Sequence, residues 1–205
     1  MDKKFQVFPE SVFHSIEELE KLLQFRYLPH NVFESAEEEK EIQEKGHEKC
    51  NLGQISSEAE ELGKRMIGKI KGGEIPDVSI RWIDEKVGHG LFVEEELSIG
   101  DYAGEYTGVV RKNDIRRYLG PLNNYCYEYP VPDDLGRSYV IDATQGHLTR
   151  FINHSFTPNL RSVHVFYEGF FHLIFLPIMP IAKGEQLTFS YGTNYWYLRR
   201  PPQVL

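Results

Sequence analysis

The chain has 205 residues, which suits one domain, or one domain with a helical extension, because a single core organises about 100 to 200 residues. Apolar residues make up 40% and charged residues 26%, a composition that excludes wholesale disorder. The 31 acidic side chains exceed the 23 Lys and Arg, and the formal charge of -8 has the wrong sign for unspecific binding to nucleic acid. A basic partner suits the chain better than DNA or RNA.

Cysteine usage and apolar runs exclude further classes of protein. Cys50 and Cys126 stand far apart, outside any CxxC or Cys/His spacing, so we expect neither a disulfide scaffold nor a bound metal. The most apolar run, Phe170 to Ala182, contains two prolines and falls short of the roughly 20 residues that span a bilayer. The start MDKKFQVFPESVF lacks the apolar centre of a secretory signal. We therefore expect no signal peptide and no membrane partner.

Residues 1–73 have a helical pattern. Ser15 with Glu18 forms a capping box before a run of apolar residues on one helix face. Two further helices follow, and the third ends at Gly72-Gly73. The serines predicted to begin the three helices are Ser15, Ser35 and Ser57.

Beyond Gly73 the pattern changes to short β-branched and aromatic runs that are separated by turn residues, which is typical of a sheet-rich domain. The predicted strands are Val78–Ile83, Gly90–Val93, Tyr102–Val110, Tyr125–Tyr129, Tyr139–Asp142, Arg161–Tyr167, Phe170–Leu176 and Leu187–Ser190. Strands and helices do not alternate regularly, so a doubly wound parallel sheet is disfavoured. We predict a mainly β fold with flanking helices, in which residues 74–197 form the main domain and residues 198–205 a short tail.

Four segments place polar or permissive residues where a sheet alone does not need them. They are Gly88-His89-Gly90, Glu105-Tyr106-Thr107-Gly108, Arg150 to Asn159 with the sequence RFINHSFTPN, and Gly184 to Gly192 with the sequence GEQLTFSYG. Each has a plain structural reading by itself: a GxG is usually a turn, a histidine usually packs in a core, and a Tyr before Gly usually packs at a strand end. Their order and spacing together are more specific.

These four segments together resemble the SET-domain protein lysine methyltransferases, over about Val78 to Tyr197. The resemblance is most specific in RFINHS followed by PN. It implies a fold of small curved sheets, in which the NHS segment is threaded beneath the loop around the terminal Tyr as a C-terminal pseudoknot. It assigns residues 74–197 to a SET domain and leaves residues 1–73 as a helical N-terminal region.

The resemblance also implies S-adenosylmethionine as the cofactor and assigns residues to it. The matching cofactor-binding positions are Gly88, His89, Gly90, Tyr125, Arg150, Asn153, His154, Tyr191 and Tyr195. Among them, the GxG loop would act through backbone groups, and Tyr195 would stack on the adenine.

On the opposite face, Tyr106, Tyr127, Phe189 and Tyr191 match positions that line a channel for the substrate lysine. The resemblance implies Tyr191 and Tyr106 as the catalytic residues. Phe189 stands where a Tyr restricts methylation in the family, so we expect di- or trimethylation. Tyr127 complicates this expectation, because a second hydroxyl in the channel would restore the restriction.

The chain departs from many histone-modifying members, since it has no cysteine-rich zinc segments before or after the SET core. The lid that such a tail supplies would have to come from Tyr195, Tyr197 and the residues after them, from the N-terminal helices, or from another subunit of a homodimer. Small SET proteins of this kind occur in viruses and intracellular bacteria. A cytoplasmic protein, or one delivered to a host compartment such as the nucleus, therefore fits the resemblance.

The resemblance implies a histone-lysine type of protein-lysine methyltransferase that acts on a basic protein. A histone tail, which would make the enzyme a chromatin regulator, and a bacterial histone-like protein are the natural substrates, with no direct contact to nucleic acid. The alternative is a catalytically inactive SET-like module that binds lysine-containing tails. A hydrolase that uses His154 and Ser155 is disfavoured, because no G-x-S-x-G turn surrounds the serine.

Overall fold

The computed structural model describes residues 5–8, 12–113, 123–133, 135–197 and 199. Within these ranges the α-helices are α1 (Ile16–Leu23), α2 (Ala36–Asn51), α3 (Ser57–Lys71) and α4 (Thr193–Tyr197), with a 3-10 turn, η2, at Leu148–Phe151. The strands are β1 (Phe5–Phe8), β2 (Val12–His14), β3 (Val32–Phe33), β4 (Val78–Asp84), β5 (Gly88–Val93), β6 (Val109–Lys112), β7 (Cys126–Pro132), β8 (Ser138–Asp142), β9 (Asn153–His154), β10 (Leu160–Tyr167), β11 (Phe170–Pro177) and β12 (Thr188–Phe189).

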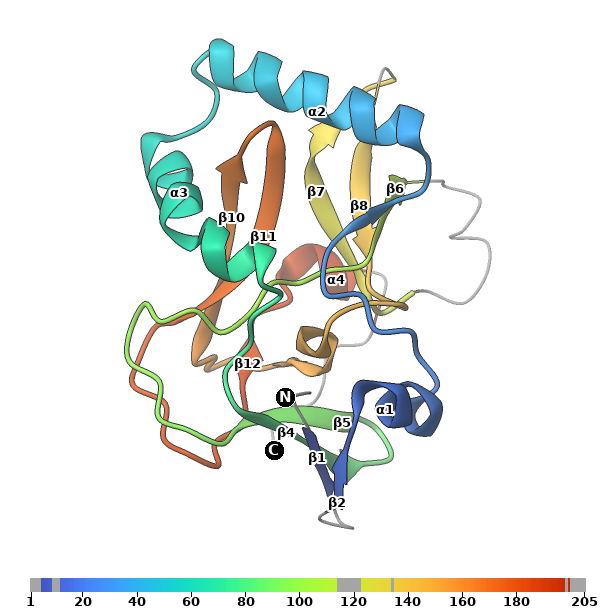
Figure 1. Ribbon diagram of the computed structural model, residues 1–205, viewed down its shortest axis with the longest axis vertical. Helices are drawn as coiled ribbons and strands as arrows, with labels where there is room; N and C mark the ends of the chain where they lie inside the picture. Colours follow the sequence, from blue (N-terminus) through green and yellow to red (C-terminus); the bar gives the residue numbers. More distant parts are fainter. Residues whose placement is uncertain (1–4, 9–11, 114–122, 134, 198, 200–205) are drawn as a thin grey trace.

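The described strands form small sheets with the orders β2-β1-β4-β5, β3-β6-β8-β7, β10-β11 and β12-β9. Figure 1 shows the first of these sheets beside α1, and α2 lying across the ends of the β7-β8 and β10-β11 pairs. Fully buried aliphatic and aromatic side chains, among them Ile80, Ile141 and Phe175, fill the space between the sheets. The predicted fold class, mainly β with flanking helices, is confirmed.

The helix starts follow the serine caps. Ser15 and Glu18 form the predicted capping box, with the Ser15 N–H donating to Glu18 Oε2 at 2.8 Å. Ser35 caps α2 as expected. The prediction of Ser57 as the third cap is wrong by one residue, because Ser56 has the extended backbone of a cap and its Oγ accepts the Ala59 N–H at 3.2 Å.

The strand expected over Tyr102–Val110 is largely wrong. Only its end belongs to a strand, since β6 begins at Val109, and the preceding residues form one isolated bridge between Glu105 and Ile174. Gly104 has a φ of 114°, which is outside the range of a regular strand. The backbone therefore turns here before it enters the sheet.

Three short strands within residues 1–73 were not predicted from the sequence. β1 pairs in parallel with β4 and antiparallel with β2, and β3 pairs in parallel with β6. Strands of two to four residues are too short for a periodic pattern. The consequence is that segments before Gly73 complete two sheets whose other strands lie beyond it.

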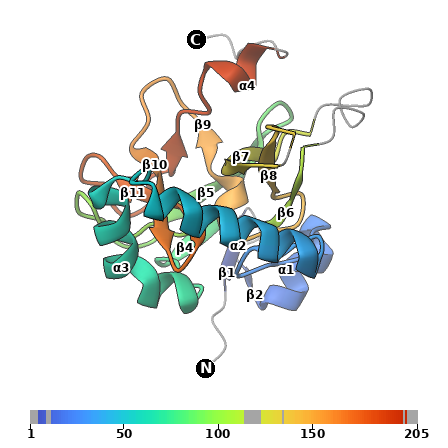
Figure 2. The same ribbon diagram turned by 90° about the horizontal axis from the view of Figure 1, so that it is seen from above.

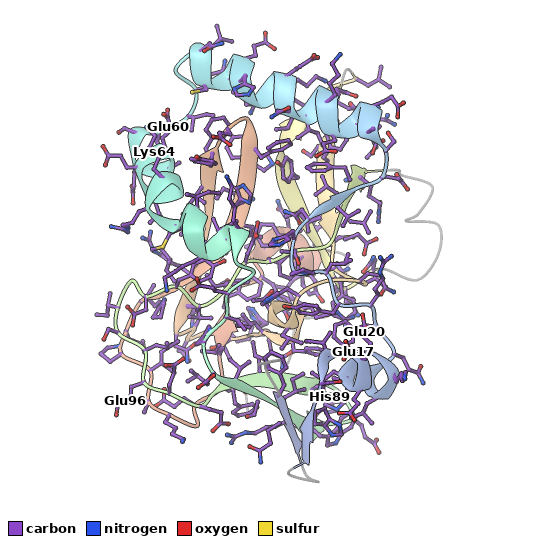
Figure 3. All side chains as sticks on the ribbon, viewed as in Figure 1. Glu17, Glu20, Glu60, Lys64, His89 and Glu96 are labelled. Carbon is purple, nitrogen blue, oxygen red and sulfur yellow. The ribbon has the colours of Figure 1, made fainter. Side chains whose placement is uncertain are left out.

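Helices α2 and α3 pack on the β10-β11 hairpin through glycines. A Cβ atom at Gly46 would overlap the carbonyl oxygen of Gly169, and one at Gly63 would overlap that of Phe166. The outer face of α3 is polar, and Figure 3 shows Lys64 on this side of the helix. Figure 2 shows α1, α2 and α3 on one side of the molecule and α4 on the other. No helix among the described residues is long and apolar enough to cross a membrane.

The close approach of α3 to β10 gives a test of this packing. Gly63→Ala is expected to lower the free energy of unfolding by about 1 to 3 kcal/mol, because the new methyl group overlaps backbone that cannot move freely. Gly68→Ala, in the same helix, is the matched control. A methyl group at Gly68 would meet no other atom within 4 Å, so the better helix propensity of Ala should raise stability by about 0.5 to 1 kcal/mol. Urea denaturation followed by circular dichroism measures both changes. If both substitutions raised, or both lowered, the free energy of unfolding, this packing would be contradicted.

Candidate active site

The RFINHS segment and the segment before Tyr191 lie side by side. The η2 turn ends at Phe151, and β9 then pairs in parallel with β12, with Asn153 opposite Thr188 and His154 opposite Phe189. The Ser155 N–H extends this pairing by donating to the Phe189 carbonyl at 3.1 Å. Two segments that are distant in the sequence are thereby joined into one short sheet. The threading of one beneath the other stays a prediction.

This pairing fixes Tyr191 at both ends. Its backbone N–H donates to His154 Nδ1 at 3.2 Å, and its hydroxyl donates to the Ile152 carbonyl at 3.0 Å. Burial raises the pKa of the Tyr191 phenol above its ordinary value, so the hydroxyl keeps its proton at neutral pH. Burial lowers the pKa of His154, which leaves that ring neutral and able to accept at Nδ1. Tyr191 is thus a rigidly held, neutral phenol.

A cavity of about 870 Å³ surrounds Tyr191. All four predicted channel residues line it, namely Tyr106, Tyr127, Phe189 and Tyr191. Among the predicted cofactor residues, Tyr125, Arg150, Tyr191 and Tyr195 line it as well. The structure therefore brings the residues expected on both sides of the reaction into one continuous space.

The rings of the channel residues pack at tilted angles around this space. The ring centroid of Phe189 lies 4.8 Å from that of Tyr191 and 6.4 Å from that of Tyr127, and Tyr106 lies 6.0 Å from Tyr127. The Tyr106 hydroxyl donates to the Tyr125 carbonyl at 2.8 Å. Burial holds the pKa of Tyr106 well above its usual value, so this phenol is also neutral. The walls are aromatic, and the two phenols donate to backbone carbonyls.

Arg150 lies among aromatic rings at the edge of the cavity. Its guanidinium carbon is 4.1 Å from the ring centroid of Tyr125 and 5.0 Å from that of Phe25, and its Nε donates to the Ala143 carbonyl at 2.8 Å. Burial lowers the pKa of this guanidinium, although the group stays charged because an arginine pKa starts above 12. A half-buried cation on aromatic faces is suited to an anionic group of a ligand.

The GxG loop lies outside the residues that line this cavity, and so do Asn153 and His154. Gly88-His89-Gly90 is the first half of β5, and Figure 3 shows His89 at the lower sheet. Asn153 Nδ2 donates to the His89 carbonyl at 3.1 Å, which ties the loop to the RFINHS segment. A Cβ atom at Gly90 would lie 2.7 Å from Gln186 Nε2 and 3.1 Å from Asn153 Nδ2, so any larger residue there would have to displace these side chains. The cofactor residues predicted from the sequence thus form two neighbouring groups.

Glu105, the acid of the second motif, has a structural partner. Its side chain is buried, and its Oε1 lies 2.8 Å from His172 Nδ1 on β11. The carboxylate is absent from the cavity lining, whereas the neighbouring Tyr106 is present. Adjacent residues here point in different directions, and Tyr106 alone serves the site.

Sequence reasoning missed two residues in the C-terminal part of the site. Trp196 packs its ring 5.0 Å from that of His154 and stacks on Tyr191, with the planes inclined by 11°. Arg199 lies 4.1 Å over the Tyr195 ring and donates to the Tyr195 carbonyl, to the Asn123 carbonyl and to Asn124 Oδ1 at 2.7 to 3.0 Å. The aromatic run Tyr195-Trp196-Tyr197 was a signal for the first, but no sequence pattern pointed to Arg199.

Comparisons with known proteins identify the family of this chain. The SET domain family profile matches residues 88–192. The histone-lysine N-methyltransferase trithorax of Drosophila virilis is 34% identical over 109 residues, which cover 51% of this chain and 3% of that protein. The histone-lysine N-methyltransferase ASHH3 of Arabidopsis thaliana is 33% identical over 115 residues, covering 52% of this chain and 30% of that protein.

Among solved structures, ctPRC2 in an autoinhibited conformation bound to S-adenosylmethionine is similar, with a TM-score of 0.52 and 29% identity, over 61% of this chain and 16% of that chain. This chain therefore spans only a small part of the relatives that it matches. The family profile, by contrast, extends over half of the chain and includes both segments that hold Tyr191. The chain belongs to the SET-domain family.

Proposed function

We propose that the protein transfers methyl groups from S-adenosylmethionine to lysine side chains of a basic protein. The single observation that carries the proposal is the cavity around Tyr191, where the predicted lysine channel and part of the predicted cofactor site meet. Trithorax and ASHH3 are named histone-lysine N-methyltransferases, and the ctPRC2 structure holds S-adenosylmethionine, which supports the same chemistry.

The residues on the cofactor side fit such a ligand. Gly88 has a φ of 78° and open space beside it, so its backbone can approach a bound molecule closely. Within the described residues, His154 Nε2 and Trp196 Nε1 are buried without a hydrogen-bond partner, and both rings lie next to Tyr191. Buried polar atoms without partners are uncommon, and a polar ligand would satisfy them. Arg150 would hold the carboxylate of the methionine part, and Tyr195 would stack on the adenine.

The substrate amine must be neutral when it reacts, and the channel favours that state. A free lysine has a pKa of about 10.4, so only a small fraction is neutral at pH 7. Walls made of Tyr106, Tyr127, Phe189 and Tyr191 penalise the ammonium by desolvation, which lowers the pKa of the bound lysine. When bound, S-adenosylmethionine supplies a sulfonium methyl group whose positive charge adds like-charge repulsion to the ammonium.

Tyr191 and Tyr106 then orient the amine. Each hydroxyl donates its proton to a backbone carbonyl, so its oxygen lone pairs are available to accept an N–H of the amine. Holding the N–H groups in this way directs the nitrogen lone pair along one line. Because burial raises the pKa of both phenols, neither is a base at neutral pH, and the proton of the ammonium leaves to water.

The substrate segment is proposed to add as a strand beside β7, which is an edge of its sheet. The Tyr125 carbonyl accepts the Ala143 N–H from the β8 side, so alternation turns the backbone groups of Glu128 and Pro130 away from β8. The Glu128 carbonyl there lies 3.2 Å from His164 Nε2, so the Glu128 N–H is the group offered to an added strand. Pro130 has no N–H, and proline in a sheet is found at edges. A histone tail or a bacterial histone-like protein would bind mainly through main-chain hydrogen bonds to this edge. The net charge of -8 favours such a basic partner.

The activity itself can be tested with Tyr191. Tritium transfer from labelled S-adenosylmethionine to mixed core histones is expected for the natural chain. Tyr191→Phe should slow it by about a hundredfold, because one positioned hydrogen-bonding group is lost. In calorimetric titration, the dissociation constants of the natural chain and of Tyr191→Phe for S-adenosylmethionine should differ by no more than a few fold. Cofactor binding with no transfer to any basic substrate would instead support the lysine-tail binding module.

The number of methyl groups can be tested at Phe189. We propose di- or trimethylation, because Phe189 is buried against Tyr191 and Phe175 and brings no hydroxyl into the channel. Phe189→Tyr is expected to shift the products of a long incubation towards monomethyllysine, as measured by mass spectrometry. A natural chain that stops at one methyl group would contradict this proposal.

The closing wall can be tested at Arg199. Its three hydrogen bonds join α4 to residues 123 and 124, so we propose that it holds Tyr195 in place. Arg199→Ala should raise the dissociation constant for S-adenosylmethionine about tenfold, which corresponds to about 1.4 kcal/mol. Arg161→Ala, on exposed β10 surface, is the matched control and should bind as the natural chain does. Equal affinities of all three proteins would show that another part of the chain, or a second subunit of a homodimer, closes the site.

A further inference from the structure

We propose that Ser162 is a positioning residue that permits more than one methyl transfer, because it binds the hydroxyl of Tyr127 and keeps it from the substrate amine. This inference rests on the proposed lysine methyltransferase activity. It concerns a residue outside the four motifs and outside the cavity lining.

The contact is a hydrogen bond of 2.9 Å between Tyr127 Oη and Ser162 Oγ, in which either oxygen can donate. Ser162 lies on β10, where it stands opposite Phe175 of β11, whose ring packs 4.9 Å from Phe189. Tyr127 lines the cavity but Ser162 does not, so the hydroxyl is directed out of the cavity towards β10. The ring of Tyr127 is thus a channel wall, and its polar end is held behind that wall.

A second residue of β10 fixes the same ring. His164 is two positions after Ser162 and therefore on the same face of the strand. Its ring packs at 5.7 Å from that of Tyr127, inclined by 66°, and its Nε2 lies 3.2 Å from the Glu128 carbonyl. Two contacts from one strand leave Tyr127 little freedom to turn its hydroxyl back into the channel while Ser162 is present.

Ser162 differs from the partners of the other channel hydroxyls. Tyr106 and Tyr191 donate to the backbone carbonyls of Tyr125 and Ile152, which every side-chain substitution leaves in place. The Tyr127 hydroxyl depends on a side chain instead. Of these three hydrogen bonds, the one between Tyr127 and Ser162 can therefore be removed by a single substitution that leaves every channel residue unchanged.

The chemistry explains why a released hydroxyl would matter. In each transfer a C–N bond forms as the carbon–sulfur bond of the sulfonium donor breaks, and the proton that the nitrogen loses passes to water. A second transfer requires the methylated nitrogen to turn, so that the lone pair regenerated by loss of the proton faces the donor and the first methyl group takes the place of an N–H. A free phenol would hold that N–H, or a water molecule, in the space that the methyl group needs. A phenol bound to Ser162 leaves the space apolar and open.

Ser162→Ala in the full chain tests this inference. Mixed core histones are incubated with S-adenosylmethionine, and mass spectrometry gives the ratio of di- and trimethyllysine to monomethyllysine. The natural chain is expected to accumulate the higher states, and Ser162→Ala should lower the ratio about tenfold. The two proteins are compared at the same total incorporation of methyl groups, so a partly unfolded variant, which only slows the reaction, gives the natural ratio, and a changed ratio reports on the channel.

Two companion variants separate the hydroxyl from the serine itself. Ser162→Thr keeps a hydroxyl at this position and should retain the natural ratio. The double variant Ser162→Ala with Tyr127→Phe removes the released phenol and should recover the ratio that Ser162→Ala loses. An unchanged ratio in Ser162→Ala, or a double variant that still stops at one methyl group, would overturn this inference and leave the methyltransferase activity intact. No transfer by the natural chain would overturn both.

Discussion

The parallel pairing of β9 with β12 is the contact on which the site depends. It places the Ile152 carbonyl under the Tyr191 hydroxyl and His154 Nδ1 beside the Tyr191 backbone N–H. A phenol held at both ends loses its rotational freedom during folding rather than during substrate binding, which is what preorganisation of a polar group requires. Two strands of two residues each would be marginal by themselves, and the surrounding aromatic packing on Phe189 and Trp196 supports them.

The two phenols proposed as catalytic donate their hydrogen bonds to backbone carbonyls, and this shapes the chemistry of the channel. Tyr106 and Tyr191 give their protons to carbonyls, and burial keeps both phenols neutral. In the proposed reaction the substrate amine meets the oxygen lone pairs and aromatic faces of the four channel residues. Glu128 also lines the cavity, and its carboxylate accepts a hydrogen bond from Ser138 Oγ at 2.7 Å. Glu105 illustrates the separation, because its carboxylate is turned away to His172 although the next residue lines the channel. In the proposed reaction the environment of the channel, rather than a dedicated base, favours loss of a proton from the incoming amine.

The sequence was most informative where a local rule applies. The capping box at Ser15 and the glycines after α3 fixed helix ends, and the β10-β11 hairpin followed from its dense β-branched and aromatic pattern. Residues of the four motifs could be assigned by resemblance, and the structure gathers the channel residues as that resemblance implied. Contacts between distant segments had no such signal. The roles of Arg199 and Ser162 depend on partners 75 and 35 residues away, and a two-residue strand such as β3 exists only because β6 offers it an edge.

The parallel pairs β1-β4 and β3-β6 also bear on how the domain can be divided. Val32 pairs with Val109, and Gln6 pairs with Ser79, so the sheets include strands that lie well before the region matched by the family profile. A fragment limited to that region would leave β6 without its neighbour on one side, with a row of unsatisfied N–H and C=O groups open to other chains. Such a fragment would tend to self-associate. In the full protein, the pairing of strands that are far apart in the sequence makes folding slow. The folded unit, in a physical sense, begins at β1 rather than at the first recognisable motif.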